Sequence, residues 1–252
     1  MNDPVEGRRI IVTGAAGGIG SGVLKGLSAR GARLAAVYNR GEPSEDLRAV
    51  AIWRQCDLSD KDQVVRCFSD LSQELGGLDA LVNIAGKWQA GPAEEVDEAQ
   101  IDYLIGANLK SAIFSNQAAF ELMKATGGRI INCGSVEGVE GNLISPVYAS
   151  AKAALHGWTR SAAKSWGQYN ITVNCIAPAM WTSVYQNIRD GMTKEQLEWF
   201  DAGLAEKIPI KGNLGDAETD CTPLIAFLAS EGSGFMTGQL LAVDGGLRML
   251  GA

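Results

Sequence analysis

A tyrosine and a lysine stand four residues apart in the segment SPVYASAK, residues 145–152. If this segment is helical, Tyr148 and Lys152 lie one above the other on the same face and can contact the same ligand. Free phenol and ammonium groups both titrate near pH ~10, so an isolated tyrosine is a poor base at neutral pH. A nearby cation favours the phenolate and lowers the pKa of the phenol. The pair is therefore expected to transfer protons.

A glycine-rich turn, VTGAAGGIG, follows an aliphatic run near the N-terminus and precedes a helical pattern. Phosphate groups can approach the N–H groups at a helix N-terminus only where no Cβ holds them off. Gly14, Gly18 and Gly20 fit a G-x3-G-x-G spacing, and Gly14, Gly17 and Gly20 fit G-x2-G-x2-G equally well. Either spacing predicts dinucleotide binding, and neither identifies the reaction.

Alternating strands and helices are expected to position these residues. Several of the aliphatic runs are apolar almost throughout, as in strands that are buried on both faces. The runs lie at 8–14, 33–39, 51–57, 79–86, 128–135, 171–178 and 238–246, with helical patterns near 18–29, 60–75, 97–125, 147–168 and 217–229. This alternation predicts an α/β fold, a doubly wound parallel sheet of about seven strands (Rossmann-like), in a single domain over residues 1–252.

Residues 179–216 interrupt the alternation, because they contain no obvious strand. Ligands bind at the carboxyl edge of such sheets, so an insertion after the sixth strand is expected to form a helical lid over the substrate. The alternative is a peripheral helix pair that packs its aromatic residues as ordinary core. The large side chains of the segment are Met180, Trp181, Tyr185, Met192, Trp199 and Phe200.

Composition argues against several classes of protein. The net charge of −7 disfavours a nucleic-acid binder, which needs a basic face. Five singly spaced cysteines predict reduced thiols rather than disulfides, and a single histidine leaves little from which to build a metal site. The N-terminal MNDPVEGRRI does not read as a signal peptide, and the apolar block LIAFLA is too short to cross a bilayer. We expect a cytoplasmic protein that holds no metal and binds neither membranes nor nucleic acid.

The motifs together resemble the short-chain dehydrogenase/reductase family along nearly the whole chain. They are TGAAGGIG, CDLSD, VNIAG, ANLKS, RIINCGSVEG, YASAK, NCIAPAM and VDGG, in the order of the family. The resemblance implies hydride transfer between a nicotinamide cofactor and a small-molecule carbonyl or secondary alcohol. It also implies a homotetramer that packs helix pairs and the last strand across two-fold axes.

The resemblance further implies a catalytic tetrad of Asn108, Ser135, Tyr148 and Lys152. Tyr148 would exchange a proton with the substrate oxygen, while Lys152 would tune the phenol and hold the nicotinamide ribose. Ser135 would hydrogen-bond the substrate oxygen, and the side chain of Asn108 could hold a proton-relaying water. Taken singly, an asparagine can mark a helix kink and a serine a turn. The next residues expected at the substrate are Trp88, Glu137 and Trp181, with Tyr185 and Trp199 nearby, which suggests an apolar or cyclic substrate.

Further positions are expected at the cofactor. Asp57 could accept a hydrogen bond from the adenine amino group, or could instead cap the following helix. The remaining cofactor positions are Gly14, Gly18, Ile19, Gly20, Tyr38, Arg40, Leu58, Asn83, Ala85, Gly86, Tyr148, Lys152, Pro178, Trp181 and Ser183. The chain departs from the family pattern at Ile84, Gly134, Ala179 and Ser183. Glu137 could equally be a solvated loop carboxylate, and His156 is expected to be a packed helix residue.

The end of the second predicted strand bears on the choice between NAD and NADP. NAD-selective relatives place an acid there, which binds the ribose hydroxyls and repels a 2′-phosphate. Here Tyr38 stands at that position, and Arg40 offers a bidentate phosphate ligand. Gly17 stands where NADP-preferring relatives often carry a second basic residue. We expect NADP, with NAD as the alternative.

Two other functions share some of these features. An epimerase or dehydratase of the extended branch has the same Tyr-x3-Lys pair, but such chains usually add a C-terminal substrate domain, and here about 70 residues follow the sixth strand. A non-catalytic nucleotide-sensing protein would have no use for both the tyrosine and the lysine.

Overall fold

One sheet of seven strands forms the centre of the molecule, in the order β3-β2-β1-β4-β5-β6-β7, and every neighbouring pair is parallel. The computed structural model describes residues 3–249, so the two ends of the predicted domain range lie outside the described residues. The strands are β1 (Arg9–Thr13), β2 (Arg33–Tyr38), β3 (Ile52–Gln55), β4 (Ala80–Asn83), β5 (Gly128–Cys133), β6 (Ile171–Pro178) and β7 (Leu240–Val243). The predicted fold class is confirmed.

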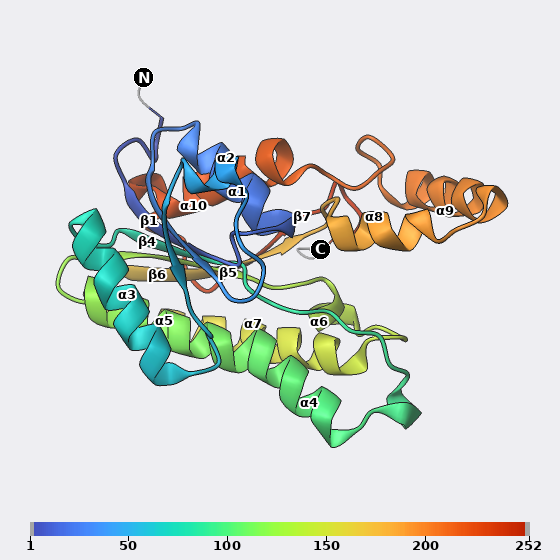
Figure 1. Cartoon of the computed structure of the whole chain (residues 1–252), viewed down its shortest axis with the longest axis horizontal. Coiled ribbons are helices and arrows are strands. Elements are labelled where there is room, and N and C mark those ends of the chain that lie inside the picture. The colour runs from blue at the N-terminus through green and yellow to red at the C-terminus, as the bar shows by residue number, and fades with distance from the viewer. Residues whose placement is uncertain (1–2, 250–252) are drawn as a thin grey trace.

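Helices cover both faces of this sheet, giving three layers (Figure 1). One face carries α1 (Gly18–Ser28), α2 (Glu45–Arg48) and α10 (Thr222–Ala229). The other carries α3 (Lys61–Leu75), α5 (Ser111–Met123) and α7 (Pro146–Trp166), with α4 (Glu98–Ile105) and α6 (Glu137–Glu140) at the end where the strands finish. A pair of helices, α8 (Ser183–Asp190) and α9 (Lys194–Lys207), projects from the same end.

Two apolar cores hold the layers together, one on each face of the sheet. Ile10, Val12 and Val82 pack against α1 and α10, while Ile11, Leu81 and Ile130 pack against α3, α5 and α7. Successive residues of each strand thus enter opposite cores, as the pleat of a strand requires. The near-continuous apolar runs of the sequence follow from burial on both faces.

The structure corrects two predicted helices. The pattern near 97–125 is not one helix, because a π-helical segment, η2 (Gly106–Lys110), separates α4 from α5. A second such segment, η4 (Ala217–Cys221), precedes α10 within the pattern near 217–229. The short helices α2 and α6 were not predicted, and α6 begins two residues after Ser135 in the loop after β5.

Parallel strands finish at a common edge, and the predicted site residues gather there. Neighbouring strands β1 and β4 leave this edge toward opposite faces, which is where a doubly wound sheet opens a ligand crevice. Thr13, Asn83 and Cys133 end three adjacent strands at this point. The fold therefore brings the glycine turn and the tyrosine–lysine helix to one place.

Candidate active site

Helix α7 presents Tyr148 and Lys152 toward the end of β5. The helix starts with Pro146 in its first turn, where a missing N–H is harmless. The Lys152 side chain is buried, and its Nζ donates a 2.6 Å hydrogen bond to the carbonyl oxygen of Cys133. The same nitrogen lies 5.5 Å from the centre of the Tyr148 ring. This backbone carbonyl, which sequence reasoning did not identify, fixes the ammonium group.

Asn108 is buried in the π-helical segment η2. Its Nδ2 donates to the carbonyls of Leu104 (2.9 Å) and Lys87 (2.8 Å), and its Oδ1 accepts the Lys87 N–H. Both amide protons are therefore used within the chain. One lone pair of Oδ1 stays open, so the proposed relay water would have to donate its hydrogen bond to this oxygen. Its bonds to Lys87 also fix the loop after β4.

Gly86 explains how Asn108 and Lys152 come together. A Cβ on Gly86 would lie 2.7 Å from Asn108 Oδ1 and 3.4 Å from Lys152 Nζ. Only a residue without a side chain can therefore pass between these two groups. The loop after β4 thus crosses directly over the lysine and the asparagine.

Ser135 completes the cluster from the loop after β5. Its Oγ accepts the N–H of Glu137 at 3.1 Å, which leaves the hydroxyl proton free for another acceptor. Burial raises the pKa of the nearby Tyr148 phenol, and the Ser135 hydroxyl partly opposes this rise. The structure therefore brings all four predicted catalytic side chains to one end of the sheet.

The protonation state of Tyr148 differs from the sequence expectation. Burial raises the pKa of the phenol above its ordinary value of 10.0, and the nearby Cys133 raises it further. Lys152 directs its ammonium group at a carbonyl rather than at the phenol oxygen. The chain alone therefore holds a neutral phenol, and the expected lowering of its pKa is not present in the protein by itself.

The backbone geometry of the glycine turn distinguishes between the two motif spacings that fit the sequence. Gly14 has φ +66°, and a Cβ there would lie 2.8 Å from the backbone of Ala85. Gly18 has φ +53°, and a Cβ on Gly20 would lie 2.1 Å from the Gly14 carbonyl oxygen. Gly17 is extended, and its Cβ position is open. The backbone thus requires glycine at 14, 18 and 20, and Gly17 fills no such need.

Buried polar side chains hold the turn against the end of β4. Thr13 donates from Oγ1 to Asn83 Oδ1 at 2.8 Å and accepts the N–H of Ala85 at 3.2 Å. The Nδ2 of Asn83 reaches Asn132 on the next strand at 3.3 Å. Asn83 therefore has a structural partner on each neighbouring strand, and Ala85 lies against Gly14.

Asp57 and Leu58 follow β3 at the predicted adenine side. One Asp57 oxygen accepts the N–H and the hydroxyl of Ser59, at 2.9 and 2.7 Å. The cap of α3 is Asp60, which accepts the N–H groups of Asp62 and Gln63. The alternative reading of Asp57 as the helix cap is therefore wrong. Leu58 is buried in the core beneath, and Ile19 packs partly buried against the opposite core.

The end of β2 is aromatic and basic. Tyr38 is half-buried and packs edge-on against Trp53, with 6.2 Å between the ring centres. Arg40 is exposed two residues further on and forms no ion pair with another residue of the described range 3–249. Its guanidinium group is available to an anion.

The insertion after β6 forms the helix pair α8 and α9. Trp181 packs edge-on against Tyr185 at 4.8 Å, and Arg189 stacks 5.1 Å from the Trp181 ring while it pairs with Asp201 of α9. The aromatic residues therefore pack partly on one another, as the alternative reading expected. Yet neither helix contains a buried residue, and Trp199 is 79% exposed. This pair is not part of a core.

The remaining predicted contacts lie around the same opening. Pro178 ends β6, and Thr182 caps α8 by accepting the N–H of Tyr185, while Ser183 is exposed beside it. Trp88 is exposed in the loop after β4. The Glu137 carboxylate accepts a 2.6 Å hydrogen bond from the hydroxyl of Ser145, so it is not a freely solvated carboxylate.

These features fit a nicotinamide cofactor. The turn at Gly14 and Gly18 leaves no Cβ between a ligand and the start of α1, and Gly86 puts no side chain over Asn108 and Lys152. Between residues 3 and 249, no three His, Cys, Asp or Glu side chains come together as a metal site. No helix in that range is long and apolar enough to cross a membrane.

Comparison with known proteins agrees with this geometry. A family model described as enoyl-(acyl carrier protein) reductase matches residues 14–248. The chain is 34% identical to the 2-dehydro-3-deoxy-D-gluconate 5-dehydrogenase of Escherichia coli, over 96% of each chain. It is 35% identical to a hydroxynaphthalene reductase-like protein of Metarhizium anisopliae, over 96% of this chain and 95% of that one. A solved short-chain type dehydrogenase/reductase from Mycobacterium ulcerans superposes with a TM-score of 0.86 at 26% identity, covering 96% of this chain and 90% of that one.

Proposed function

This chain belongs to the short-chain dehydrogenase/reductase family of oxidoreductases, and we propose that Tyr148, Lys152, Ser135 and Asn108 carry its reaction. The supporting observation is the 2.6 Å contact between Lys152 Nζ and the Cys133 carbonyl, which anchors α7 beside Ser135. The reaction is the reduction of a carbonyl, or the oxidation of the corresponding secondary alcohol. A bound nicotinamide ring supplies or accepts the hydride.

The residues of the chain divide the remaining work. Ser135 donates its free hydroxyl proton to the substrate oxygen and holds that oxygen near Tyr148. The buried, neutral phenol of Tyr148 delivers a proton to the same oxygen during reduction. Oxidation needs the phenolate, which the Lys152 ammonium 5.5 Å away helps to stabilise. Asn108 binds the loop that carries Gly86 and keeps this loop against Lys152.

A carbonyl screen tests this proposal. Purified protein is mixed with NADPH or NADH and a panel of ketones and aldehydes, and loss of nicotinamide absorbance is followed. We expect turnover by the wild type and its near-complete loss in Ser135→Ala, with cofactor binding retained. Equal turnover by Ser135→Ala would show that the serine has no part in the reaction.

We also propose NADP as the preferred cofactor. Support comes from the exposed guanidinium of Arg40 beyond the end of β2 and from Tyr38, which brings no negative charge to that position. A 2′-phosphate would meet an unpaired cation there rather than a carboxylate. Tighter binding of NADH than of NADPH in a fluorescence titration would overturn this preference.

The helix pair α8 and α9 is proposed to be a lid that closes over an apolar or cyclic substrate. Its exposed Val184 and Ile188, with Trp181 at its base, give it an apolar surface. The relatives include proteins named for a sugar acid and for a naphthalene ring, so similarity alone leaves the substrate open. Faster turnover of small polyols than of cyclic alcohols would contradict this substrate class.

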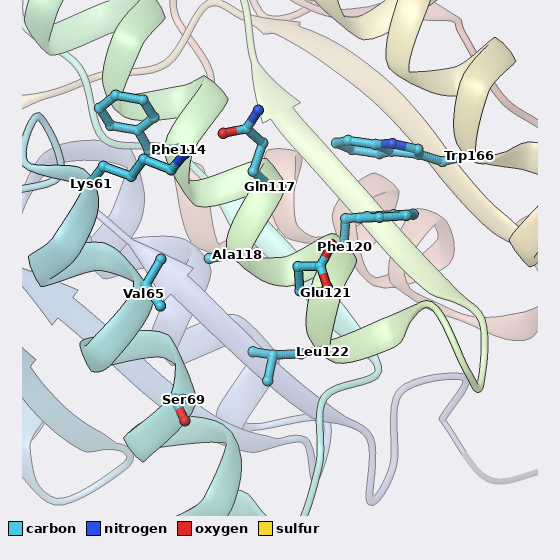
Figure 2. Close-up of a pocket in the computed structure, with 10 residues that line it drawn as sticks. All are labelled: Lys61, Val65, Ser69, Phe114, Gln117, Ala118, Phe120, Glu121, Leu122 and Trp166. Atoms are coloured by element: carbon cyan, nitrogen blue, oxygen red, sulfur yellow. The ribbon is translucent and has the colours of Figure 1, made fainter.

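A homotetramer is proposed on the basis of two apolar surfaces outside the site. One is a groove of about 540 Å³ between α3, α5 and α7, where the Phe120 and Trp166 rings stack at 4.7 Å and Phe114 and Val65 line the opposite side (Figure 2). The other carries Phe235, which is fully exposed before β7. We propose that further copies of this chain cover both. Light scattering that finds a monomer at micromolar concentration would exclude this assembly.

A cytoplasmic location is proposed as well. All five cysteines are unpaired and buried, as reduced thiols in a cytoplasmic protein would be. Recovery of the native protein in a periplasmic or secreted fraction would contradict this location.

A further inference from the structure

The only histidine of the chain, His156, lies directly beneath the loop that carries Ser135. It follows Tyr148 and Lys152 by two turns and one turn of α7, so the three side chains share one helix face. Its side chain is 5% exposed, and its Nε2 accepts the backbone N–H of Ser135 at 3.5 Å. No role in the proposed reaction accounts for this placement.

The loop from Gly134 to Gly138 is shaped around the imidazole ring. A Cβ on Gly134 would lie 2.6 Å from His156 Nε2, and also 2.6 Å from the sulfur of Cys175. A Cβ on Gly138 would lie 2.8 Å from His156 Cε1 and 2.7 Å from the backbone nitrogen of Ala153. Both ends of the loop therefore need glycine, because the ring and its surroundings fill the space of a side chain.

This packing accounts for a departure noted in the sequence. The chain departs from the family pattern at Gly134. Any side chain there would bring its Cβ to 2.6 Å from the imidazole nitrogen that receives the Ser135 N–H, which is too close for two atoms that are not bonded. The imidazole ring of His156 thus fills the space that a side chain at position 134 would need, next to the proposed catalytic serine.

The protonation state of the ring fits an acceptor. Burial, followed by the positive charges of Arg160 and Lys152, lowers the pKa of His156 to about 4, so the ring is neutral under ordinary conditions. A neutral ring that accepts at Nε2 carries its proton on Nδ1. The backbone of Ser135 therefore meets a lone pair and not an N–H group.

We propose that His156 is a positioning residue, which holds the hydroxyl of Ser135 in place by accepting the Ser135 backbone N–H and by supporting the loop from Gly134 to Gly138. This inference rests on the proposed role of Ser135 in the reaction. His156 does not touch the substrate, and its effect passes through the serine, whose Oγ also receives the N–H of Glu137.

Two substitutions of similar volume separate the hydrogen bond from the packing. His156→Leu fills the space without an acceptor, and His156→Gln restores an acceptor. We expect His156→Leu to lower kcat about ten- to a hundredfold with little change in cofactor affinity or melting temperature. His156→Gln should regain most of the lost activity. Wild-type kcat in His156→Leu, or equal losses in both variants, would overturn the proposal.

A spectroscopic measurement tests the same point without activity. With one histidine in the chain, nitrogen NMR of the labelled imidazole reports a single tautomer. We expect the proton on Nδ1 in the wild type, and a proton on Nε2 would overturn the proposal. Ser135→Ala is the activity control. If that variant keeps full turnover, the proposed role of Ser135 fails; if it is inactive while His156→Leu is normal, only the role of His156 fails.

Discussion

The ammonium nitrogen of Lys152 lies 2.6 Å from the carbonyl oxygen of Cys133, the last residue of β5. This contact joins the first half of α7 to the sheet two residues before Ser135. The lysine thus has two functions, because it anchors the helix and places a positive charge 5.5 Å from the ring of Tyr148. A lysine that only neutralised a ligand would not need this carbonyl.

Replacing Lys152 by methionine should test whether its charge is needed for the reaction, which the charge of an exposed helix lysine is not. The variant keeps much of the side-chain volume but loses the charge and the bond to Cys133. We expect kcat to fall about a hundredfold. In the pH profile of alcohol oxidation, the pKa assigned to Tyr148 should rise, because the phenolate loses the nearby cation. Lys164→Met, on the exposed surface of the same helix, is the control. A pH profile of Lys152→Met that matches the wild type would contradict this role.

The glycine turn yields a prediction with an internal control. Gly14→Ala should weaken cofactor binding and lower the melting temperature, because φ +66° is strained for alanine and the new Cβ meets Ala85 at 2.8 Å. Gly17→Ala should do neither, because its Cβ position is open. Fluorescence titration and thermal melting check both variants. Equal losses of cofactor binding in the two variants would show that the cofactor also needs glycine at position 17, as the spacing of Gly14, Gly17 and Gly20 implies.

Arg40 should decide the cofactor preference. Arg40→Asp replaces the proposed phosphate ligand by a carboxylate that repels the 2′-phosphate and can bind ribose hydroxyls. We expect the ratio of kcat/KM for NADPH to that for NADH to invert. Arg33→Asp changes the charge equally at the opposite end of β2, and it should leave the ratio unaltered. An unchanged ratio in Arg40→Asp would show that Arg40 is only a surface charge.

His156 should dominate the loss of stability in mildly acidic solution. Its pKa falls from 6.5 in the unfolded chain to about 4 in the folded protein, so the unfolded state binds more protons between these values. The contribution of neutral His156 to the free energy of unfolding is therefore fully present above pH 6.5. It decreases by about 3 kcal/mol as the pH falls to 4. Denaturant unfolding at several pH values measures this slope.

The carboxylate of Asp79 affects the free energy of unfolding in a lower pH range than His156 does. Asp79 has its pKa lowered from 3.8, so its contribution is present above that value and is lost only below it. His156→Gln should consequently flatten the stability curve between pH 4 and 6.5 and leave the steeper loss at lower pH. A slope equal to that of the wild type would assign the effect to other groups.

Much of the fold could be predicted because burial leaves a clear pattern in the sequence. Every predicted strand is present, since strands covered on both faces are apolar almost throughout. The π-helical segment at Asn108 could not be predicted. The Leu104 carbonyl accepts from the Asn108 side chain, and the spacing of apolar residues carries no sign of such a bond.

The location of the proposed site could be predicted where side-chain chemistry points to it, and less so where backbone groups contribute. Tyr148 and Lys152 were proposed from their types and spacing, and Ser135 from the family resemblance. The Cys133 carbonyl was not, because every residue has a carbonyl group. His156 was recognised as a packed residue, but its contact with Ser135 depends on a loop path that only the three-dimensional structure gives.

The most direct test of the account is a single-turnover measurement on Tyr148→Phe. Enzyme loaded with reduced cofactor is mixed rapidly with a carbonyl that the wild type reduces, and the loss of cofactor fluorescence gives the rate of the chemical step. Phenylalanine fills the same space but carries no proton, so we predict a rate lower by about 10² to 10⁴ with unchanged cofactor affinity. A folded variant that reacts at the wild-type rate would contradict the assignment of Tyr148 as the proton donor.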